Sequence, residues 1–328
     1  KPVVVYQLTW SAGGDALVVK DSIKTAKDLK GKTVAVQAYG PHVDYLTKIL
    51  VDAGLTVKDV TIKWTKDLTG TDQTPAAALR TDSKVDAAFV IIPDALALTS
   101  NGTVGTGAED SVRGARVLLS TKTANRIIAD VYAVRSDYFQ AHRVEVEKFV
   151  KGLMLAEESL GRLVAAKDKQ KAEYQKMVTV AADVLLDSPQ AVRDAEGLLA
   201  DCEYVGFAGN VAFFTNLNNL RNLDRLTEEV QTSFLAAGLL GKKVALDHAR
   251  WDYEALKVGL ANVQNVETPR FDTSEVARVV DRHQKQGTLQ EGELFSFEVY
   301  FQPNQNGFSA DQYGDAFNRV VELSATYG

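Results

Sequence analysis

The sequence has few of the residues from which disulfides and metal sites are built. Its one cysteine, Cys202, has no partner for an internal disulfide and lies among apolar residues at helical spacing, so we expect a buried structural thiol. The four histidines, His42, His142, His248 and His283, are scattered and show no metal-ligand spacing. The sequence therefore predicts no metal and no bound cofactor.

Catalytic motifs, long apolar runs and an excess of basic residues are also lacking. The chain has no G-x-S-x-G, H-E-x-x-H, phosphate-loop or C-x-x-C motif. No run of about 18 apolar residues predicts a membrane span, and no signal peptide is visible. With 37 Lys and Arg against 43 Asp and Glu, and a net charge of −6, no nucleic-acid partner is predicted.

What is present is an ordinary globular composition, 45% hydrophobic and 24% charged over 328 residues, long enough for two domains or two lobes. Predicted strands alternate with helices up to about residue 130, which is typical of a mainly parallel α/β sheet covered on both faces. The strands are predicted at 3–8, 15–20, 32–37, 60–64, 85–91, 117–120 and 128–135, and the helices at 41–53, 75–79 and 93–98.

The second half has a different character. Apolar residues recur at helical spacing and predict helices at 144–163, 170–186, 189–202, 210–216 and 222–238. Ser188 and Pro189 are typical of a helix start. Residues 242–293 are mixed and polar, whereas 294–301 form a predicted strand and 309–326 a predicted helix.

The segment Tyr39-Gly40-Pro41-His42 is the strongest candidate for ligand binding from the residues alone. It follows a buried strand and opens a helix, where free backbone N–H groups favour an anion. Gly40 permits a close approach of ligand or backbone, and His42 is a candidate to face the ligand. The alternative is an ordinary strand–helix turn that binds nothing.

Three other places carry polar groups that either bind a ligand or serve the fold. The turn Trp10-Ser11-Ala12-Gly13-Gly14-Asp15 offers pocket-lining groups, or is a tight turn with glycines at positive φ. Pro93-Asp94 begins a helix, where the helix dipole alone accounts for a carboxylate. Asp130, expected to be semi-buried, requires either a ligand amine or an internal partner such as Arg126.

The order of these segments resembles the nitrate/sulfonate/taurine-type solute-binding proteins of ABC importers. The resemblance covers about residues 3–240. That family's Ser-x-Gly-x-Asp-Gly-like turn corresponds here to Ser11-Ala12-Gly13-Gly14-Asp15. Its DLKGK-x-VAV motif corresponds to Asp28-Leu-Lys-Gly-Lys32 followed by Thr33–Gln37. Val85–Ile92 with Pro93 corresponds to its hydrophobic run before proline, although Ile91 and Ile92 stand where many members have Trp. The stretch IIADVYAVRSDYFQAH, 127–142, corresponds to its return strand.

The resemblance implies an α/β, type II periplasmic-binding-protein-like two-lobed fold with a helical C-terminal half. Residues 1–15 would be a crossover strand, 16–128 the second lobe, 129–240 the return strand and helical part of the first lobe, and 241–293 a linker. The family begins with roughly 80–100 residues that form the core of the first lobe, the size of a small domain. That N-terminal part of lobe 1 is missing from this sequence.

The resemblance also implies a site in a cleft between the lobes. The residues that it places there are Trp10, Ser11, Gly13, Gly14, Asp15, Tyr39, Gly40, Pro41, His42, Pro93, Asp94 and Asp130. The helix start hints at an anionic ligand, whereas Asp15 and Asp130 hint at a cation or amine, so a zwitterion or a polar neutral molecule stays open.

The C-terminal residues 294–328 resemble the truncated start of an OmpA-like peptidoglycan-binding domain. The resemblance lies in the stretch FSFEVYFQPNQNGFSADQYGDAFNRVVELSATYG. The part of that domain that binds the wall peptide would lie beyond Gly328. This resemblance implies that a longer parent protein is tethered to peptidoglycan.

Together these features predict an exported periplasmic solute receptor, with a signal or lipoprotein segment upstream, that delivers a small molecule to an ABC transporter permease. Two alternatives stay open. One is an enzyme of small-molecule metabolism resembling pyrimidine-precursor enzymes of this fold, for which His42 is the only histidine suitably placed. The other is a structural or interaction protein with a vestigial cleft.

Overall fold

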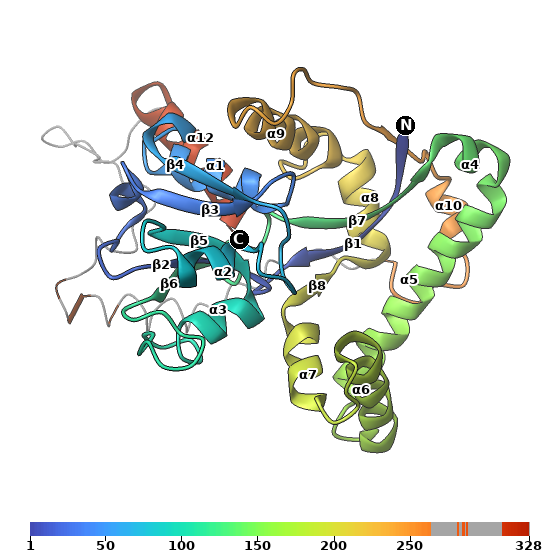
Figure 1. Cartoon of the computed structure of the whole chain (residues 1–328). Helices are drawn as coiled ribbons and strands as arrows, with labels where there is room; N and C mark the ends of the chain where they lie inside the picture. The colour runs from blue at the N-terminus through green and yellow to red at the C-terminus, as the bar shows by residue number, and fades with distance from the viewer. Residues whose placement is uncertain (264–280, 282–283, 286, 288–309, 328) are drawn as a thin grey trace, which may run out of the picture. The chain divides into compact units, whose positions relative to one another are not determined.

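The computed structural model of the chain describes residues 1–263, 281, 284–285, 287 and 310–327 (Figure 1). Two compact units make up the chain. Unit 1 comprises Lys1–Gly14, Ile128–Thr227 and Val244–Thr268, and unit 2 comprises Asp15–Ile127, Glu228–Lys243 and Pro269–Gly328. Because the chain passes between the units several times, each unit is built from segments that are distant in sequence.

Unit 2 is an α/β layer structure around one sheet with the strand order β4-β3-β5-β2-β6. Strands β3, β4 and β5 are parallel, as predicted, whereas β2 is antiparallel to both β5 and β6. The strands are β2 (Asp15–Val19), β3 (Thr33–Gln37), β4 (Thr61–Thr65), β5 (Ala87–Ile91) and β6 (Arg116–Ser120). The helices within Asp15–Ile127 are η1 (Ala26–Leu29), α1 (His42–Asp52), η2 (Val57–Asp59), α2 (Pro75–Thr81) and α3 (Ile92–Leu98).

Side chains along the strands of unit 2 point alternately to the two faces of the sheet, and each face packs against an apolar layer. Small residues such as Ala35 and Ala88 face a core shared with α2 and α3. Their neighbour Phe89 points to the other face, where its ring contacts Tyr45 of α1 at a centroid distance of 5.2 Å. Figure 1 shows α1 on one face of the sheet and α2 and α3 on the other. The predicted two-sided covering of the sheet is therefore present.

Unit 1 has a smaller sheet with the strand order β7-β1-β8, to which β9 adds by pairing with β1. Its strands are β1 (Pro2–Ser11), β7 (Ala129–Arg135), β8 (Cys202–Tyr204) and β9 (Asp247–His248). Its helices are α4 (Ser136–Ala141), α5 (Arg143–Ala165), α6 (Lys171–Leu186), α7 (Val192–Ala200), α8 (Gly206–Thr215) and α10 (Tyr253–Leu256). Helix α9 (Leu223–Ala236) begins in unit 1 and ends in unit 2.

The central strand β1 uses both of its edges. One edge pairs with β7 in antiparallel register. On the other edge β9 pairs with Val3 and Val4, the Trp251 indole N–H donates to the Val5 carbonyl at 2.8 Å, and β8 pairs with the end of the strand. Between these, the Asn210 amide donates to the Gln7 carbonyl and its oxygen accepts from the Gln7 N–H, both at 2.9 Å. Side chains thus satisfy the buried backbone groups where no strand is adjacent.

The structure corrects several expectations. The helix predicted from Ser188-Pro189 begins at Val192, and its predicted end is strand β8. Cys202 is therefore in a strand, half-buried, and not in a buried helical position. Part of the segment predicted to be a linker belongs to unit 1, because buried Trp251 and β9 attach it to β1. The helical periodicity failed at Cys202 because pairing with β1 extends the chain there.

The C-terminal helix α12 (Ala310–Tyr327) corresponds to the helix predicted at 309–326. It is part of unit 2, where Arg319 forms an ion pair with Asp52 and the Thr326 carbonyl accepts from the Arg126 N–H at 3.1 Å. The predicted strand at 294–301 and His283 lie outside the described residues. No helix in the described part of the chain is long and apolar enough to cross a membrane.

A half-buried carboxyl group joins three elements of unit 1. Glu157 of α5 accepts a hydrogen bond from the Tyr6 hydroxyl of β1 and another from the Gly206 N–H at the start of α8, both at 2.8 Å. Burial raises the pKa of Glu157 from 4.5 to about 7, and the two hydrogen bonds only partly oppose this shift. Burial and the neighbouring Glu157 charge also raise the pKa of Tyr6, so its hydroxyl stays a donor.

We expect this carboxyl group to make the stability of unit 1 depend on pH. Between pH 4.5 and about 7 folded Glu157 holds a proton that the unfolded chain has released, so the free energy of unfolding falls as pH rises through that window. Glu157→Gln removes this contribution. We measure the free energy of unfolding of both proteins by urea denaturation. From pH 4.5 to pH 8 that of the native protein should fall relative to that of Glu157→Gln.

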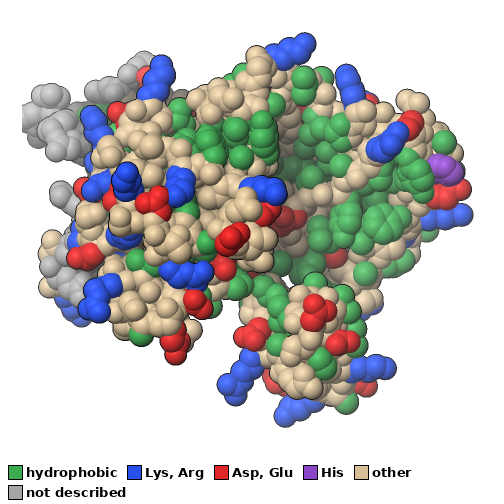
Figure 2. Space-filling model, viewed as in Figure 1, with side chains coloured by type: hydrophobic (Ala, Val, Ile, Leu, Met, Phe, Trp, Pro, Cys, Tyr) green, Lys and Arg blue, Asp and Glu red, His purple; other side chains and the backbone are tan. Residues whose placement is uncertain are grey.

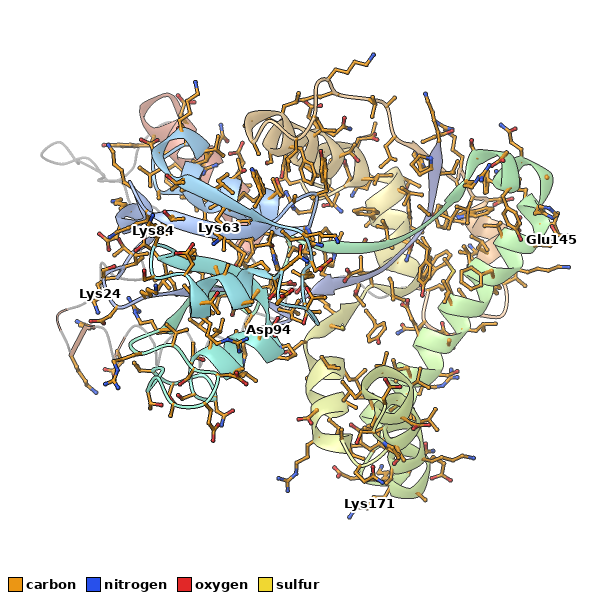
Figure 3. All side chains as sticks on the ribbon, in the orientation of Figure 1. Lys24, Lys63, Lys84, Asp94, Glu145 and Lys171 are labelled. Carbon is orange, nitrogen blue, oxygen red and sulfur yellow. The ribbon has the colours of Figure 1, made fainter. Side chains whose placement is uncertain are left out.

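The matched control is Glu145→Gln, an exposed carboxylate near the start of the same helix, labelled in Figure 3. The difference in unfolding free energy between Glu145→Gln and the native protein should stay the same at every pH. If the difference in unfolding free energy between Glu157→Gln and the native protein is also independent of pH, the assignment of the pH dependence to Glu157 is wrong.

Candidate functional site

The predicted site residues belong to both units, so each group is described within its own unit. Unit 2 contains Asp15, Tyr39, Gly40, Pro41, His42, Pro93 and Asp94, and unit 1 contains Trp10, Ser11, Gly13, Gly14 and Asp130.

In unit 2 the predicted residues lie at one edge of the sheet. Strands β3 and β5 are parallel, so the segments that follow them, 38–42 and 92–94, leave the sheet at the same edge. Strand β2 runs the other way and pairs Asp15 with Ile91, which brings the start of β2 to that edge too. This is the edge at which α/β sheets commonly bind ligands.

Asp15 and His42 form a buried pair at this edge. The distance from Asp15 Oδ1 to His42 Nε2 is 2.7 Å, and the His42 side chain has no exposed surface. The ring lies against Phe89, and its Nδ1 has no hydrogen-bond partner among the described residues. His42 was a candidate to face the ligand, but its burial instead makes it the group that holds the Asp15 carboxylate.

Tyr39 has the conformation and exposure of a ligand contact. Its φ of 61° lies in the left-handed region, which is uncommon for a residue other than glycine and is often found at functional sites. The side chain is 68% exposed, and its ring centroid lies 6.5 Å from that of Phe234. Gly40 and Pro41 follow, and Pro41 precedes the first residue of α1. The segment before α1 therefore presents an exposed aromatic ring.

Asp94 is a half-buried carboxyl group in the first turn of α3 and is labelled in Figure 3. Burial raises its pKa, while a hydrogen bond from Thr69 and the charge of Arg80 oppose the shift. Its Oδ2 is buried without a hydrogen-bond partner among the described residues. Pro93 beside it is exposed. A carboxyl group in this state is suited either to hydrogen bonding with a ligand or to capping α3.

In unit 1 the predicted turn is fixed by contacts within the fold. Trp10 is buried and meets Phe213 edge to face, with the centroids 5.9 Å apart. Gly13 has a φ of 142°, and a Cβ there would lie 2.5 Å from Asp201 Oδ1. Ser11 is also buried and donates its N–H to the Ile128 carbonyl at 3.0 Å. Positive φ and close approach at Gly13 agree with the turn interpretation.

Asp130 differs from expectation. It was expected to be semi-buried, but it is exposed on β7, and its Oδ2 accepts a hydrogen bond from the Thr9 hydroxyl at 2.7 Å. The strand is at the border of its sheet, and this position leaves Asp130 accessible to solvent.

Several neighbours of these residues carry no signal in the sequence. The Asp15 N–H donates to Thr121 Oγ1 at 3.1 Å. Asp201 lies beside Gly13, Thr69 hydrogen-bonds to Asp94, and the Phe234 ring lies near that of Tyr39. All come from distant segments or from loops without a motif. Within the described ranges no group of three or more His, Cys, Asp or Glu residues is placed to hold a metal ion.

Residues 5–160 match the protein-family model described as NMT1/THI5 like. A search of curated proteins finds no match. Among solved structures, a putative sulfonate ABC transporter, periplasmic sulfonate-binding protein SsuA from Methylobacillus flagellatus KT matches with a TM-score of 0.50 and 20% identity, over 82% of this chain and 73% of that one.

Two further similarities are weaker. The periplasmic aliphatic sulphonate binding protein SsuA from Escherichia coli has 20% identity and a TM-score of 0.46, over 74% of this chain and 67% of that one. The alkanesulfonate-binding protein SsuA from Xanthomonas axonopodis pv. citri, bound to MOPS, has 19% identity and a TM-score of 0.47, over 76% of this chain and 74% of that one. The fold is thus the α/β type II periplasmic-binding-protein-like fold.

The buried pair at the sheet edge leads to a stability prediction. His42→Ala leaves the Asp15 carboxylate without this partner and creates a cavity beside Phe89, so we expect the free energy of unfolding to fall by about 3 kcal/mol. In a double-mutant cycle with Asp15→Asn, the coupling energy should exceed about 1 kcal/mol. His142→Ala, at an exposed histidine, is the control and should change stability by less than about 0.5 kcal/mol. Additive effects of Asp15→Asn and His42→Ala would rule out the pairing.

Proposed function

We propose that the chain is the ligand-capturing part of a periplasmic solute receptor that serves an ABC importer. It would bind a small polar molecule through the residues at the edge of the unit 2 sheet. The observation that carries the proposal is Tyr39, an exposed aromatic residue in a left-handed conformation at the start of α1. An exposed aromatic side chain on a backbone held in the left-handed region is suited to recognition.

The neighbours of Tyr39 support binding of a polar solute. Asp94 offers a half-buried carboxyl group, and the Asp15–His42 pair keeps the start of α1 attached to β2. Helix N–H groups that favour an anion and carboxylates that favour an amine are together suited to a zwitterion or a polar neutral molecule.

The similarity to the Methylobacillus flagellatus protein, a periplasmic sulfonate-binding protein of a putative sulfonate ABC transporter, supports the transport role and the periplasmic location for this chain. A permease would then be its protein partner. The C-terminal resemblance to an OmpA-like domain supports tethering of the parent protein to peptidoglycan.

A receptor fits the chemistry of the site better than an enzyme does. His42, the histidine at the candidate site, is fully buried and bonded to Asp15. A general acid or base must reach the proton that it transfers, and His42 has no exposed surface for a substrate.

The proposal is tested by binding to the full-length protein. Taurine, methanesulfonate, nitrate and glycine betaine are screened by thermal shift, and any binder is measured by isothermal titration calorimetry. We expect at least one to raise the melting temperature, because a ligand that binds only the folded state stabilises it. Tyr39→Ala should weaken that binding roughly 10-fold, or about 1.4 kcal/mol.

The control variant is Tyr138→Ala, because Tyr138 is also an exposed tyrosine but belongs to α4 of unit 1. It should leave the dissociation constant unchanged. If none of the solutes shifts the melting temperature, or if Tyr39→Ala binds as tightly as the native protein, the proposed site is wrong.

A further inference from the structure

The end of the unit 2 sheet opposite the candidate site brings together segments that are distant in sequence. Strands β3, β4 and β5 are parallel and all begin at this end, whereas β2, which is antiparallel to β5, ends there. The segments around these strand ends are 20–32, 56–63 and 82–86, together with Arg116, the first residue of β6. We name this set of residues the basic surface.

Hydrogen bonds join the segments of the basic surface to one another. The Gly31 N–H donates to the Asp59 carbonyl at 2.6 Å, and the Lys20 N–H donates to the Asp86 carbonyl at 2.9 Å. The Arg116 guanidinium donates to two carbonyls of the first segment, both at 3.0 Å. The charged side chains that these segments carry are therefore held close together in unit 2.

The basic surface is positive although the chain is negative. Its segments contain nine Lys and Arg residues and five Asp residues, a net charge of +4, whereas the whole chain has a net charge of −6. Figure 2 shows Lys and Arg side chains spread over the visible face of unit 2. In Figure 3, Lys24 and Lys84 lie on one side of unit 2 and Asp94 lies on the other. The positive charge is thus concentrated away from the candidate site.

The five carboxylates of the basic surface have partners within the fold. Asp28 and Asp59 each accept backbone N–H groups in a capping box, and Asp86 accepts a backbone N–H at the start of β3. Asp21 and Asp82 form ion pairs with lysines, both at 2.6 Å. These carboxylates therefore serve the local structure of unit 2.

Five lysines of the basic surface have no such partner. The side chains of Lys27, Lys30, Lys32, Lys58 and Lys84 form no hydrogen bond or ion pair with any residue that the structure describes. Four of these side chains are exposed, and that of Lys32 is half-buried. Lysines without a fixed partner keep their rotamer freedom, and this favours a partner whose own charges are mobile.

The composition of the basic surface differs from that of a protein–protein interface. Such interfaces have aromatic residues, Met and Arg at their centre and contain few Lys. None of the large hydrophobic side chains that are exposed on the described part of the chain belongs to segments 20–32, 56–63 or 82–86. A lipid surface needs no apolar centre, because anionic headgroups attract each nearby Lys separately.

We propose that the basic surface is a docking surface for a bilayer that contains anionic phospholipids. Its lysines would lie among the headgroup phosphates. The opposite end of the sheet, with Tyr39 and Asp94, would point away from the lipid, so docking would leave the candidate site accessible.

Vesicle sedimentation tests the proposal. The purified protein is mixed with vesicles of phosphatidylcholine and phosphatidylglycerol, and in parallel with vesicles of phosphatidylcholine alone. We expect the protein to sediment at low salt with the anionic vesicles only. Binding should weaken at least roughly tenfold at about 0.5 M NaCl, because salt screens exposed charges.

Substitution of three of the unpaired lysines identifies the surface. The triple variant Lys27→Gln, Lys30→Gln and Lys58→Gln should bind the anionic vesicles at least roughly 30-fold more weakly, because each Lys near an anionic surface contributes about a fivefold factor. Its melting temperature should equal that of the native protein, since the three side chains are exposed.

The matched control removes the same charge from unit 1. Lys167→Gln, Lys169→Gln and Lys171→Gln change three exposed lysines around the start of α6, where Lys171 is labelled in Figure 3. This variant should bind the anionic vesicles as tightly as the native protein does. An equal loss of binding in the two triple variants would assign the effect to net charge and overturn the proposal.

Three other outcomes overturn the proposal. The first is no binding to anionic vesicles at low salt, even if an acidic protein binds the basic surface. The second is equal binding to neutral and anionic vesicles. The third is competition by excess glycerol 3-phosphate at constant ionic strength, which would indicate a discrete phosphate site. None of these measurements requires a solute, so they do not depend on the proposed transport function.

Discussion

The hydrogen bonding of β1 is the constraint on which unit 1 depends. A buried strand leaves no backbone group free, and β1 meets this requirement with β7 on one edge and with β9, Trp251, Asn210 and β8 on the other. These partners come from three separate parts of the chain, residues 129–135, 202–210 and 247–251. Their assembly on one strand explains why unit 1 is discontinuous in sequence and why residues near 250 are folded against its first strand.

In unit 2 the equivalent constraint is the direction of the strands. Because β2 runs against β5, the first residue of unit 2, Asp15, lies at the edge where β3 and β5 end. The buried bond from Asp15 to His42 then connects that residue to the first turn of α1. A buried hydrogen-bonded pair contributes little net stability but is costly to break, so its value here lies in the position that it gives to the start of α1 and to Tyr39.

The predicted site residues of unit 1 and those of unit 2 differ in how much of their surface is exposed. The turn of unit 1 is occupied by internal contacts of Trp10 and Gly13, whereas Tyr39 is open to solvent. In the proposed function, ligand recognition would therefore depend more on Tyr39 and Asp94 than on Trp10 or His42. A fold of this class hosts both receptors and enzymes, so function has to be argued from these groups and not from the architecture.

The sequence by itself determined the strands and the α-helices within Asp15–Ile127 of unit 2, because period-two and period-3.6 patterns reflect local burial, and Pro41 and Pro93 mark helix starts. It also located Tyr39 and Asp94 at helix starts. Only the tertiary structure decided that His42 is buried against Asp15, that Asp130 is exposed, and that Cys202 is in a strand. Each of these depends on a partner distant in the chain, Asp15, Thr9 and Ser11 respectively, and no local pattern encodes such a partner.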